Sequence, residues 1–313
     1  MQIGLLEPDR FDPFAIAQLQ IIGNVVPYDG GDIHAFLRPL QVLFVRLAHQ
    51  IDAALLAKAP ALRYLCSPTT GHTHLDERAL AVRGIKVVSL RGEQVFLETI
   101  RATPEHTLGL VLALLRQYRG AFLHVQNGGW NRDLFRGEEL FGQRVGIVGL
   151  GRVGFRVASY CAAFGASVSY VDTGEVLASE GWQRLGSVQE LISTNRIIIL
   201  CASYVNGQAP ILEKPEIALL RDHYLVNTAR GELVDEEALL AAIDGGQLAG
   251  VATDVIRHEI GPNQLARWRA ASINHNVILT PHIGGATFTA MARTENFIVQ
   301  KLAQALEAAE RVI

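Results

Sequence analysis

Three glycines, Gly149, Gly151 and Gly154, stand between an apolar run and a segment with helical apolar spacing. This order of strand, glycine turn and helix is the context in which a GxGxxG pattern binds dinucleotides. The first glycine can take the tight turn, the second leaves room for a pyrophosphate, and the third lets helix and strand pack closely. Free N–H groups at the helix start attract the phosphates. The pattern therefore predicts a dinucleotide-binding domain of the Rossmann type.

An acidic residue, Asp172, ends the next predicted strand, Ser167–Val171. A carboxylate at this point can bind both ribose hydroxyls of NAD and repels the 2′-phosphate of NADP. Thr173 and Gly174 follow it, and no arginine stands nearby in the sequence to receive that phosphate. The sequence therefore predicts NAD as the cofactor.

Short apolar runs alternate with helical patterns over most of the chain, which is typical of βαβ units and a parallel sheet. A polar stretch, residues 91–103, interrupts the alternation and is followed by a helical pattern at Glu105–Tyr118. We expect two α/β domains with parallel sheets, Rossmann-like and flavodoxin-like, flanking an active-site cleft. The substrate domain is expected to contain residues 1–98 and 287–313, and the NAD-binding domain residues 99–286.

The composition excludes several other classes of protein. A net charge of −3 and a pI near 6.4 provide no basic field for a nucleic-acid backbone. The N-terminus lacks the apolar stretch of a signal peptide, and the most apolar run, Leu108–Leu115, is too short to span a membrane. Three widely spaced cysteines indicate neither a disulfide framework nor a zinc site, and the turn residues His72 and His74 lack a third metal ligand. We expect a cytoplasmic protein with no metal, nucleic-acid or membrane partner.

Three polar residues, Arg230, Glu259 and His282, each follow a predicted strand in the second half of the chain. The carboxyl ends of parallel strands meet at one edge of a sheet, where ligands bind. An imidazole can donate a proton near neutral pH, and a carboxylate can orient it and favour its protonated form. A guanidinium can bind a carboxylate through two hydrogen bonds. Reduction of a 2-oxo acid needs these groups beside a hydride donor, although each residue alone also has an ordinary structural explanation.

The order and spacing of several motifs resemble those of the D-isomer-specific 2-hydroxyacid dehydrogenase family. The resemblance covers most of the chain, and the combination of motifs is more specific than any one of them. The motifs that carry it are Val145–Gly154 with Asp172, Asn227–Asp235, Asp254 with Glu259, Thr280–Thr287, Pro104–Leu110 and Thr69–Asp76.

The resemblance implies a role for each matching residue. Arg230 would bind and polarise the substrate, His282 would be the acid and base, and Glu259 would be its partner. Thr70 and Gly71 would offer backbone N–H groups to the substrate carboxylate. The residues that would meet NAD are Gly149, Gly151, Arg152, Val153, Gly154, Asp172, Thr107, Cys201, Thr228, Ala229, Asp254 and Gly284.

The chain also departs from the family's usual pattern. Cys201–Tyr204 stands where the family usually has His and Pro, so this wall of the adenine and ribose site is expected to differ in shape. The usual Glu-Pro is replaced by Glu259–Pro262, which keeps the glutamate. The family forms dimers through the nucleotide-binding domain. Gly120–Leu140, which overlaps the irregular surface segment 121–142, is therefore the expected homodimer arm.

Within the family, Val45–Leu47, Trp130–Asp133 and Gly285–Thr287 look most like the phosphoglycerate dehydrogenase branch. Arg46 matches an anion-binding position of that branch, and Arg91 is a second candidate for holding a substrate phosphate. Both can equally be surface arginines whose stems pack on apolar neighbours. Glyoxylate or hydroxypyruvate is the alternative substrate. A non-catalytic NAD-sensing protein is a different class, which the intact catalytic residues disfavour. Formate oxidation is less favoured, since that branch has a longer N-terminus.

Overall fold

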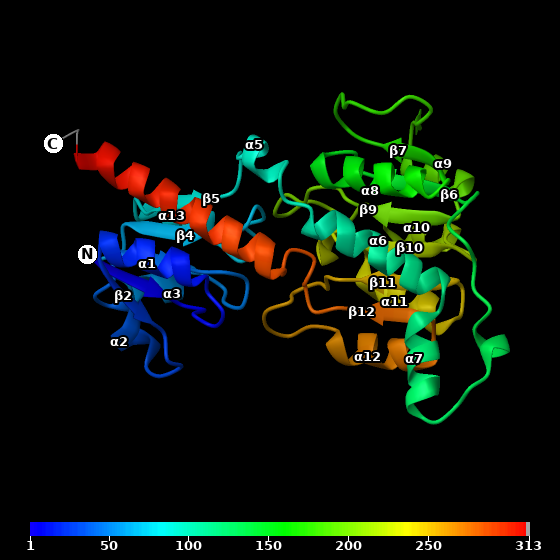
Figure 1. The fold of residues 1–313 in the computed structure, drawn as a ribbon, viewed down its shortest axis with the longest axis horizontal. Coiled ribbons are helices and arrows are strands. Elements are labelled where there is room, and N and C mark those ends of the chain that lie inside the picture. The colour runs from blue at the N-terminus through cyan, green and yellow to red at the C-terminus, as the bar shows by residue number, and fades with distance from the viewer. Residues whose placement is uncertain (311–313) are drawn as a thin grey trace. The chain divides into compact units, whose positions relative to one another are not determined.

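The structure, a computed structural model, describes residues 1–310. It contains two compact units: unit 1 comprises Met1–Ile100 and the residues from Ala286 onward, and unit 2 comprises Arg101–Gly285. Each unit is built on a parallel sheet with helices on both faces (Figure 1). The predicted fold class of two parallel-sheet α/β domains is therefore confirmed.

Unit 1 contains a five-stranded parallel sheet in the order β2-β1-β3-β4-β5, which is the flavodoxin-like order. Its strands are β1 (Gln2–Leu5), β2 (Asn24–Pro27), β3 (Val42–Phe44), β4 (Tyr64–Ser67) and β5 (Lys86–Ser89). The middle strands β1, β3 and β4 are almost wholly buried, so they form continuous apolar runs in the sequence. The edge strand β2 is only partly buried, and its short Val-Val-Pro run did not predict a strand.

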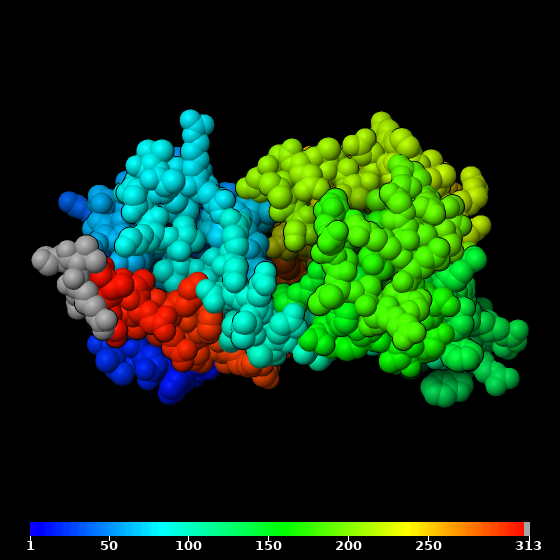
Figure 2. Space-filling model, turned by 90° about the horizontal axis from the view of Figure 1, so that it is seen from above, coloured from blue at the N-terminus to red at the C-terminus, as the bar shows by residue number. Residues whose placement is uncertain are grey.

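Aspartates begin four helices of unit 1, where the side chains of Asp12, Asp32, Asp52 and Asp76 accept hydrogen bonds from the first turn. One face of the sheet packs against α1 (Pro13–Ile22) and α13 (Phe288–Glu310), the other against α2 (Ile33–Leu37), α3 (Ala53–Ala57) and α4 (Glu77–Val82). Helix α13 also covers α5 (Gln94–Leu97), because Phe297 stacks on Phe96. Figure 2 shows α13 in red on the surface of unit 1, between blue and cyan segments.

Unit 2 contains a seven-stranded parallel sheet in the order β12-β11-β10-β9-β6-β7-β8. Its strands are β6 (Arg144–Val148), β7 (Ser167–Val171), β8 (Gln183–Arg184), β9 (Ile197–Leu200), β10 (Tyr224–Asn227), β11 (Gly250–Thr253) and β12 (Val277–Leu279). The chain starts in the middle at β6, runs outward to β8 and then returns to β9 on the other side. This is the Rossmann arrangement, whose ligand site lies at the carboxyl ends of the strands where the order reverses.

Helices cover both faces of this sheet. One core includes α6 (Ala102–Leu115) and α8 (Arg152–Ala163), and the other includes α9 (Val188–Thr194), α10 (Lys214–Leu219), α11 (Glu236–Asp244) and α12 (Leu265–Asn274). Buried strand residues alternate between the two cores, as the period of two along a strand requires. Among residues 1–310, no helix is both long and apolar enough to cross a bilayer.

The segment after α6 is more ordered than the sequence predicted. Gln117, at φ +50°, separates α6 from a further helix, α7 (Tyr118–Gln126), and a short 3₁₀ helix η1 (Arg132–Phe135) follows. The prediction that residues 121–142 are irregular is therefore wrong in part. No residue of α7 is buried. The helix therefore lacks the apolar stripe of a helix that packs on a core, and the sequence did not predict it. Figure 1 shows α7 at one end of unit 2, at an angle to α6.

Candidate functional site

The glycine turn follows β6 at the carboxyl end of the strand. Gly149 has φ +87°, a conformation that L side chains rarely adopt, and a Cβ there would lie 2.5 Å from Ala202 Cα. A Cβ on Gly154 would collide with the carbonyl oxygen of Gly149, whereas a Cβ on Gly151 would meet nothing within 4 Å. The first and third glycines thus serve the packing of the protein itself. The second keeps a space that the protein does not fill, which fits a pyrophosphate at the start of α8.

Asp172 faces this turn from the end of β7. Its Oδ2 accepts a hydrogen bond from Leu150 N–H at 2.7 Å, and its Oδ1 accepts one from Gly174 N–H at 2.9 Å. The two bonds fix the carboxylate beside the glycine turn and leave acceptor capacity on both oxygens. This placement fits the recognition of ribose hydroxyls.

An arginine that the sequence analysis missed lies beside Asp172. Strand β8 pairs with β7 so that Arg184 stands opposite Tyr170, and the Arg184 guanidinium donates to the carbonyl oxygens of Asp172 and Gly174 at 2.9 and 2.8 Å. The expectation that no arginine lies near Asp172 is therefore wrong for the folded protein, although no arginine is close to Asp172 in the sequence. Only the strand pairing brings Arg184 to this loop, and it binds the backbone there.

The three proposed catalytic residues follow neighbouring strands. Arg230 comes after β10, Glu259 lies in the loop after β11, and His282 follows β12. His282 Nδ1 lies 2.6 Å from Glu259 Oε2, and both side chains are partly exposed. Burial lowers the pKa of Arg230, and the negative charges of Glu259 and Glu232 oppose that shift. The structure thus brings His282 and Glu259 into direct contact, and the charge of Glu259 stabilises that of Arg230.

Asp254 holds the turn that carries His282. Its carboxylate accepts hydrogen bonds from Thr280 Oγ1 at 2.6 Å and from the N–H groups of Ile283 at 2.8 Å and Gly284 at 2.7 Å. Its carbonyl oxygen accepts one from His282 N–H. Burial alone would raise the pKa of Asp254, but these bonds and one from His106 hold it below its usual value. These hydrogen bonds stabilise the backbone of His282 at φ +53°, a positive angle that is uncommon for residues other than glycine.

Other expected cofactor residues lie at the same edge of the sheet. Buried Thr107 on α6 contacts Thr228 through their hydroxyls at 2.7 Å, which joins α6 to the end of β10. Ala229 N–H donates to Asn227 Oδ1, so this turn is fixed from within. Cys201 comes directly after β9, and burial raises the pKa of its thiol to about 12. The Cys201 thiol is therefore unreactive. The remaining two expected contacts are in the first turn of α8: Arg152 and Val153.

Thr70 and Gly71 belong to unit 1 and follow β4. The hydroxyl of Thr69 donates to the carbonyl oxygen of Gly71 at 3.1 Å and also contacts Ser67 Oγ at 2.8 Å. Thr70 itself is exposed. This loop is held by its own hydrogen bonds, and its surface presents Thr70 to solvent.

The Arg91 side chain is exposed and pairs with Glu77 at 2.6 Å. The same Glu77 oxygen contacts His72 Nδ1 at 2.6 Å. Burial lowers the pKa of His72, opposed by Glu77. His72 and His74 are both buried, and His74 lies in a turn between β4 and α4. Within residues 1–310, no group of three or more His, Cys, Asp or Glu residues is arranged to hold a metal ion.

Arg46 serves the packing of unit 1. Its guanidinium donates to Glu295 Oε1 at 2.6 Å and to the carbonyl oxygen of Asp9 at 2.9 Å, and it lies over the ring of Phe11. The Glu295 side chain is only 1% exposed, and its other oxygen accepts a hydrogen bond from Asp12 N–H. Burial raises the pKa of Glu295, opposed by Asp12 N–H and Arg46. These contacts support the structural interpretation of Arg46.

Replacement of Arg46 by methionine is expected to lower the free energy of unfolding by about 3–5 kcal/mol, because it leaves the Glu295 carboxylate buried without its cation. Urea unfolding measures the change. The matched control is Arg91→Met, which removes an exposed pair and should cost at most about 1 kcal/mol. Equal losses in the two variants would contradict the structural role of Arg46.

Comparison with known proteins agrees with this geometry. Residues 108–284 match the model of the family described as "D-isomer specific 2-hydroxyacid dehydrogenase, NAD binding domain". The D-3-phosphoglycerate dehydrogenase of Mycobacterium tuberculosis (strain ATCC 25618 / H37Rv) is 32% identical over 312 residues, which cover 96% of this chain and 56% of that protein. The glyoxylate reductase of Pyrococcus furiosus is 28% identical over 85% of this chain and 79% of that protein.

The fold has counterparts among solved structures. The D-lactate dehydrogenase of Aquifex aeolicus, solved with NAD and lactic acid, aligns with a TM-score of 0.84 at 24% identity, over 100% of this chain and 97% of that chain. The chain spans about half the length of the phosphoglycerate dehydrogenases that it matches. The family resemblance and the NAD cofactor expected from the sequence are confirmed. This chain belongs to the D-isomer-specific 2-hydroxyacid dehydrogenase family, and residues 108–284 match its NAD-binding domain.

Proposed function

We propose that this chain is an NAD-dependent dehydrogenase that interconverts a D-2-hydroxy acid and its 2-oxo acid. The observation that carries the proposal is the 2.6 Å contact between His282 and Glu259, with Arg230 beside it at the same sheet edge as the glycine turn. Such a group of residues has no evident structural purpose, because its members sit in loops and two of them are partly exposed. It supports catalysis over a role as a non-catalytic NAD sensor.

The proposed mechanism divides the reaction among these side chains. NADH, when bound, would supply the hydride for the carbonyl carbon. His282 donates a proton to the carbonyl oxygen, and Glu259 orients the imidazole through Nδ1 and stabilises its positive charge. Arg230 binds the substrate carboxylate and polarises the carbonyl. In the oxidative direction His282 takes the proton back.

Within this proposal, separate groups of residues would bind the pyrophosphate, the adenosine ribose and the nicotinamide of the cofactor. The glycine turn and the first turn of α8 would bind the pyrophosphate, and Asp172 the adenosine ribose. Thr107 would lie near the nicotinamide and Asp254 would meet its carboxamide. The remaining lining residues would be Cys201, Thr228, Ala229 and Gly284. Thr70 and Gly71 would supply N–H groups to the substrate carboxylate.

The pair 3-phosphoglycerate and phosphohydroxypyruvate is the first candidate substrate. The names of several curated relatives support it. Arg46 gives it little support, because Glu295 and Asp9 already use that guanidinium. Arg91, exposed and paired with Glu77, remains the cation that we propose for a substrate phosphate. Glyoxylate or hydroxypyruvate is the alternative, supported by the glyoxylate reductase relative.

Oxidation of NADH by the purified chain tests the reaction and the substrate together. The panel contains phosphohydroxypyruvate, hydroxypyruvate, glyoxylate and pyruvate, each repeated with NADPH. Preference for phosphohydroxypyruvate, lost in Arg91→Met, would support the phosphate assignment. Preference for an unphosphorylated acid would promote the alternative, and tight NADH binding without any turnover would favour the sensing role.

Gly151→Ala is expected to weaken NADH binding at least about tenfold, roughly 1.4 kcal/mol, without lowering the thermal midpoint. The reason is that a methyl group at this position enters space that only the cofactor would use. The contrasting variant is Gly154→Ala, whose Cβ collides with the Gly149 carbonyl and should destabilise unit 2. Calorimetric titration and thermal unfolding give both readouts. Unchanged NADH affinity in Gly151→Ala would contradict the pyrophosphate assignment.

We also propose a cytoplasmic homodimer formed through unit 2. Exposed apolar side chains are frequent in the expected arm, on α7 and in the residues after it: Phe122, Leu123, Val125, Trp130 and Leu134. An apolar patch of this kind marks an interface. Phe122→Glu is expected to convert the dimer to monomer in sedimentation velocity, whereas the control Ile21→Glu, at an exposed site of unit 1, should leave it intact. A dimer that survives Phe122→Glu would contradict this interface.

A further inference from the structure

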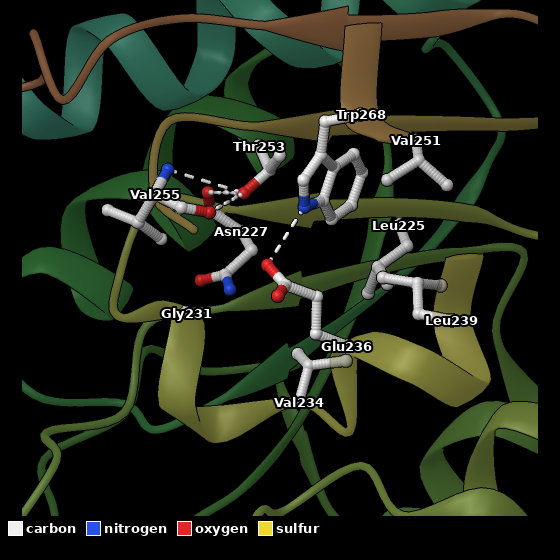
Figure 3. A pocket seen from close by; sticks show the side chains of 10 residues that line it. All are labelled: Leu225, Asn227, Gly231, Val234, Glu236, Leu239, Val251, Thr253, Val255 and Trp268. Carbon is white, nitrogen blue, oxygen red and sulfur yellow. Dashed lines mark hydrogen bonds between the residues drawn. The ribbon is translucent and has the colours of Figure 1, made fainter. Parts of the chain in front are cut away.

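Glu236 is a buried carboxylate that binds the loop containing Glu259. It is the first residue of α11 and is 6% exposed. Its Oε1 accepts hydrogen bonds from Trp268 Nε1 at 2.8 Å and from Arg257 N–H at 3.0 Å. Figure 3 shows the indole of Trp268 pointing its nitrogen at this carboxylate. Glu236 therefore joins α11 to α12 and to the loop after β11.

The peptide bond between Ile256 and Arg257 is held from a second side as well. A Cβ built on Gly231 would collide with the carbonyl group of Ile256 and with the nitrogen of Arg257. Gly231 is buried and has no room for a side chain there. One peptide bond is thus fixed between the 3₁₀ turn η2 (Gly231–Leu233) and the carboxylate of Glu236.

Gly231 and the Ile256–Arg257 peptide each lie next to a proposed catalytic residue in the sequence. Gly231 directly follows Arg230, and Glu259 comes two residues after Arg257. His258, between Arg257 and Glu259, has φ +55°, so the chain turns sharply just after the Ile256–Arg257 peptide. The distance between the Arg230 turn and the Glu259 loop therefore depends on this contact.

The surroundings of Glu236 do not form a ligand site. The residues drawn in Figure 3 enclose a cavity of about 10 Å³, and most of them are apolar. A space of this size accommodates about one water molecule and no substrate or nicotinamide. The contacts described for Glu236 are accordingly with protein groups.

We propose that Glu236 is a positioning residue that holds Glu259 against His282 by anchoring the Ile256–Arg257 peptide beside the Arg230 turn. The inference rests on the proposed dehydrogenase function. Loss of the Glu236 contact is expected to lower the reaction rate more than it lowers the stability of the fold. The reason is that a displacement of about 1 Å at a catalytic group can cost about 10²-fold in rate.

Glu236→Leu tests the proposal, because leucine fills the space but accepts no hydrogen bond. We expect kcat to fall about 10- to 100-fold and the alkaline limb of the pH–rate profile to move to lower pH, as in Glu259→Gln. The reason is that an imidazolium without its carboxylate releases its proton more readily. In a Glu259→Gln background the same change should have little further effect. Glu236→Gln keeps an acceptor oxygen for both donors and should restore most of kcat.

Two further variants separate positioning from general loosening of the fold. Trp268→Phe removes one donor and leaves the Arg257 contact, so it should lower the thermal midpoint but keep the pH–rate profile. Arg257→Ala keeps the backbone N–H and should change neither. The proposal is overturned if Glu236→Leu retains the parent profile, or if Trp268→Phe shifts the profile equally.

Modification of His282 by diethyl pyrocarbonate provides a readout that needs no turnover. Only the unprotonated imidazole reacts, so peptide mass spectrometry at neutral pH should find faster modification of His282 in Glu236→Leu and in Glu259→Gln than in the parent chain. Faster modification in Glu259→Gln alone would overturn the role of Glu236 and leave the His282–Glu259 pair intact. A parent chain that reduces no 2-oxo acid would instead count against the proposed function, while the modification rates still test the anchor.

Discussion

The His282→Gln variant is expected to lose about 10²- to 10⁴-fold in kcat, the usual contribution of a positioned general acid. Glutamine is similar in size but cannot deliver a proton near neutral pH. NADH affinity should stay near that of the parent chain, because the His282 ring contacts Glu259 and not the glycine turn. Single-turnover kinetics and a separate NADH titration measure the two quantities.

Two comparisons sharpen this prediction. Glu259→Gln should lose less than His282→Gln, since it weakens the orientation of the imidazole without removing it. Loss of NADH binding in His282→Gln, or a kcat close to that of the parent chain, would contradict the role assigned to His282.

Arg230→Gln is expected to lower kcat/KM about 10²- to 10⁴-fold. Two hydrogen bonds from a charged donor are worth about 3–6 kcal/mol in total, and each 1.4 kcal/mol corresponds to tenfold. Both KM and kcat should change, because the guanidinium would bind the substrate carboxylate and also polarise the carbonyl. Initial-rate kinetics over a wide range of substrate concentration separate the two effects.

The Arg230→Lys variant is the informative control. Lysine keeps the charge but lacks the planar pair of donors, so it should recover only part of the lost kcat/KM. Full recovery would mean that a point charge suffices and that two parallel hydrogen bonds are not formed. A normal kcat/KM in Arg230→Gln would remove Arg230 from the site.

The parts of this fold that the sequence predicts are those encoded by local patterns. Buried parallel strands such as β3 and β9 form apolar runs, and the glycine turn combines tight packing with a fixed place between strand and helix. The order of Arg230, Glu259 and His282 after successive strands was also accessible, since parallel strands bring their carboxyl ends together. The direct contact between Glu259 and His282 required the structure.

The parts that the sequence does not predict depend on contacts across the fold. Arg184 reaches the Asp172 loop only because β8 pairs with β7. The hydrogen bond of Arg46 to Glu295, a residue of α13 far away in sequence, supports a structural role for this arginine. Asp254 and Glu236 bind backbone N–H groups in turns next to the proposed catalytic residues, and no local pattern reveals such contacts. Helix α7 went unrecognised because none of its residues faces a core.

We propose that this chain moves a hydride between NADH and C2 of a 2-oxo acid, to give the D-isomer. Reduction of the preferred acid with NADH deuterated at C4 of the nicotinamide tests it most directly, once each face of the ring has been labelled separately. NMR of the product should find one deuterium at C2 with only one of the two labelled cofactors, and chiral chromatography should find the D configuration for any acid other than glyoxylate, whose product has no D or L form. An L product, or a product whose C2 hydrogen comes from water, would contradict the claim.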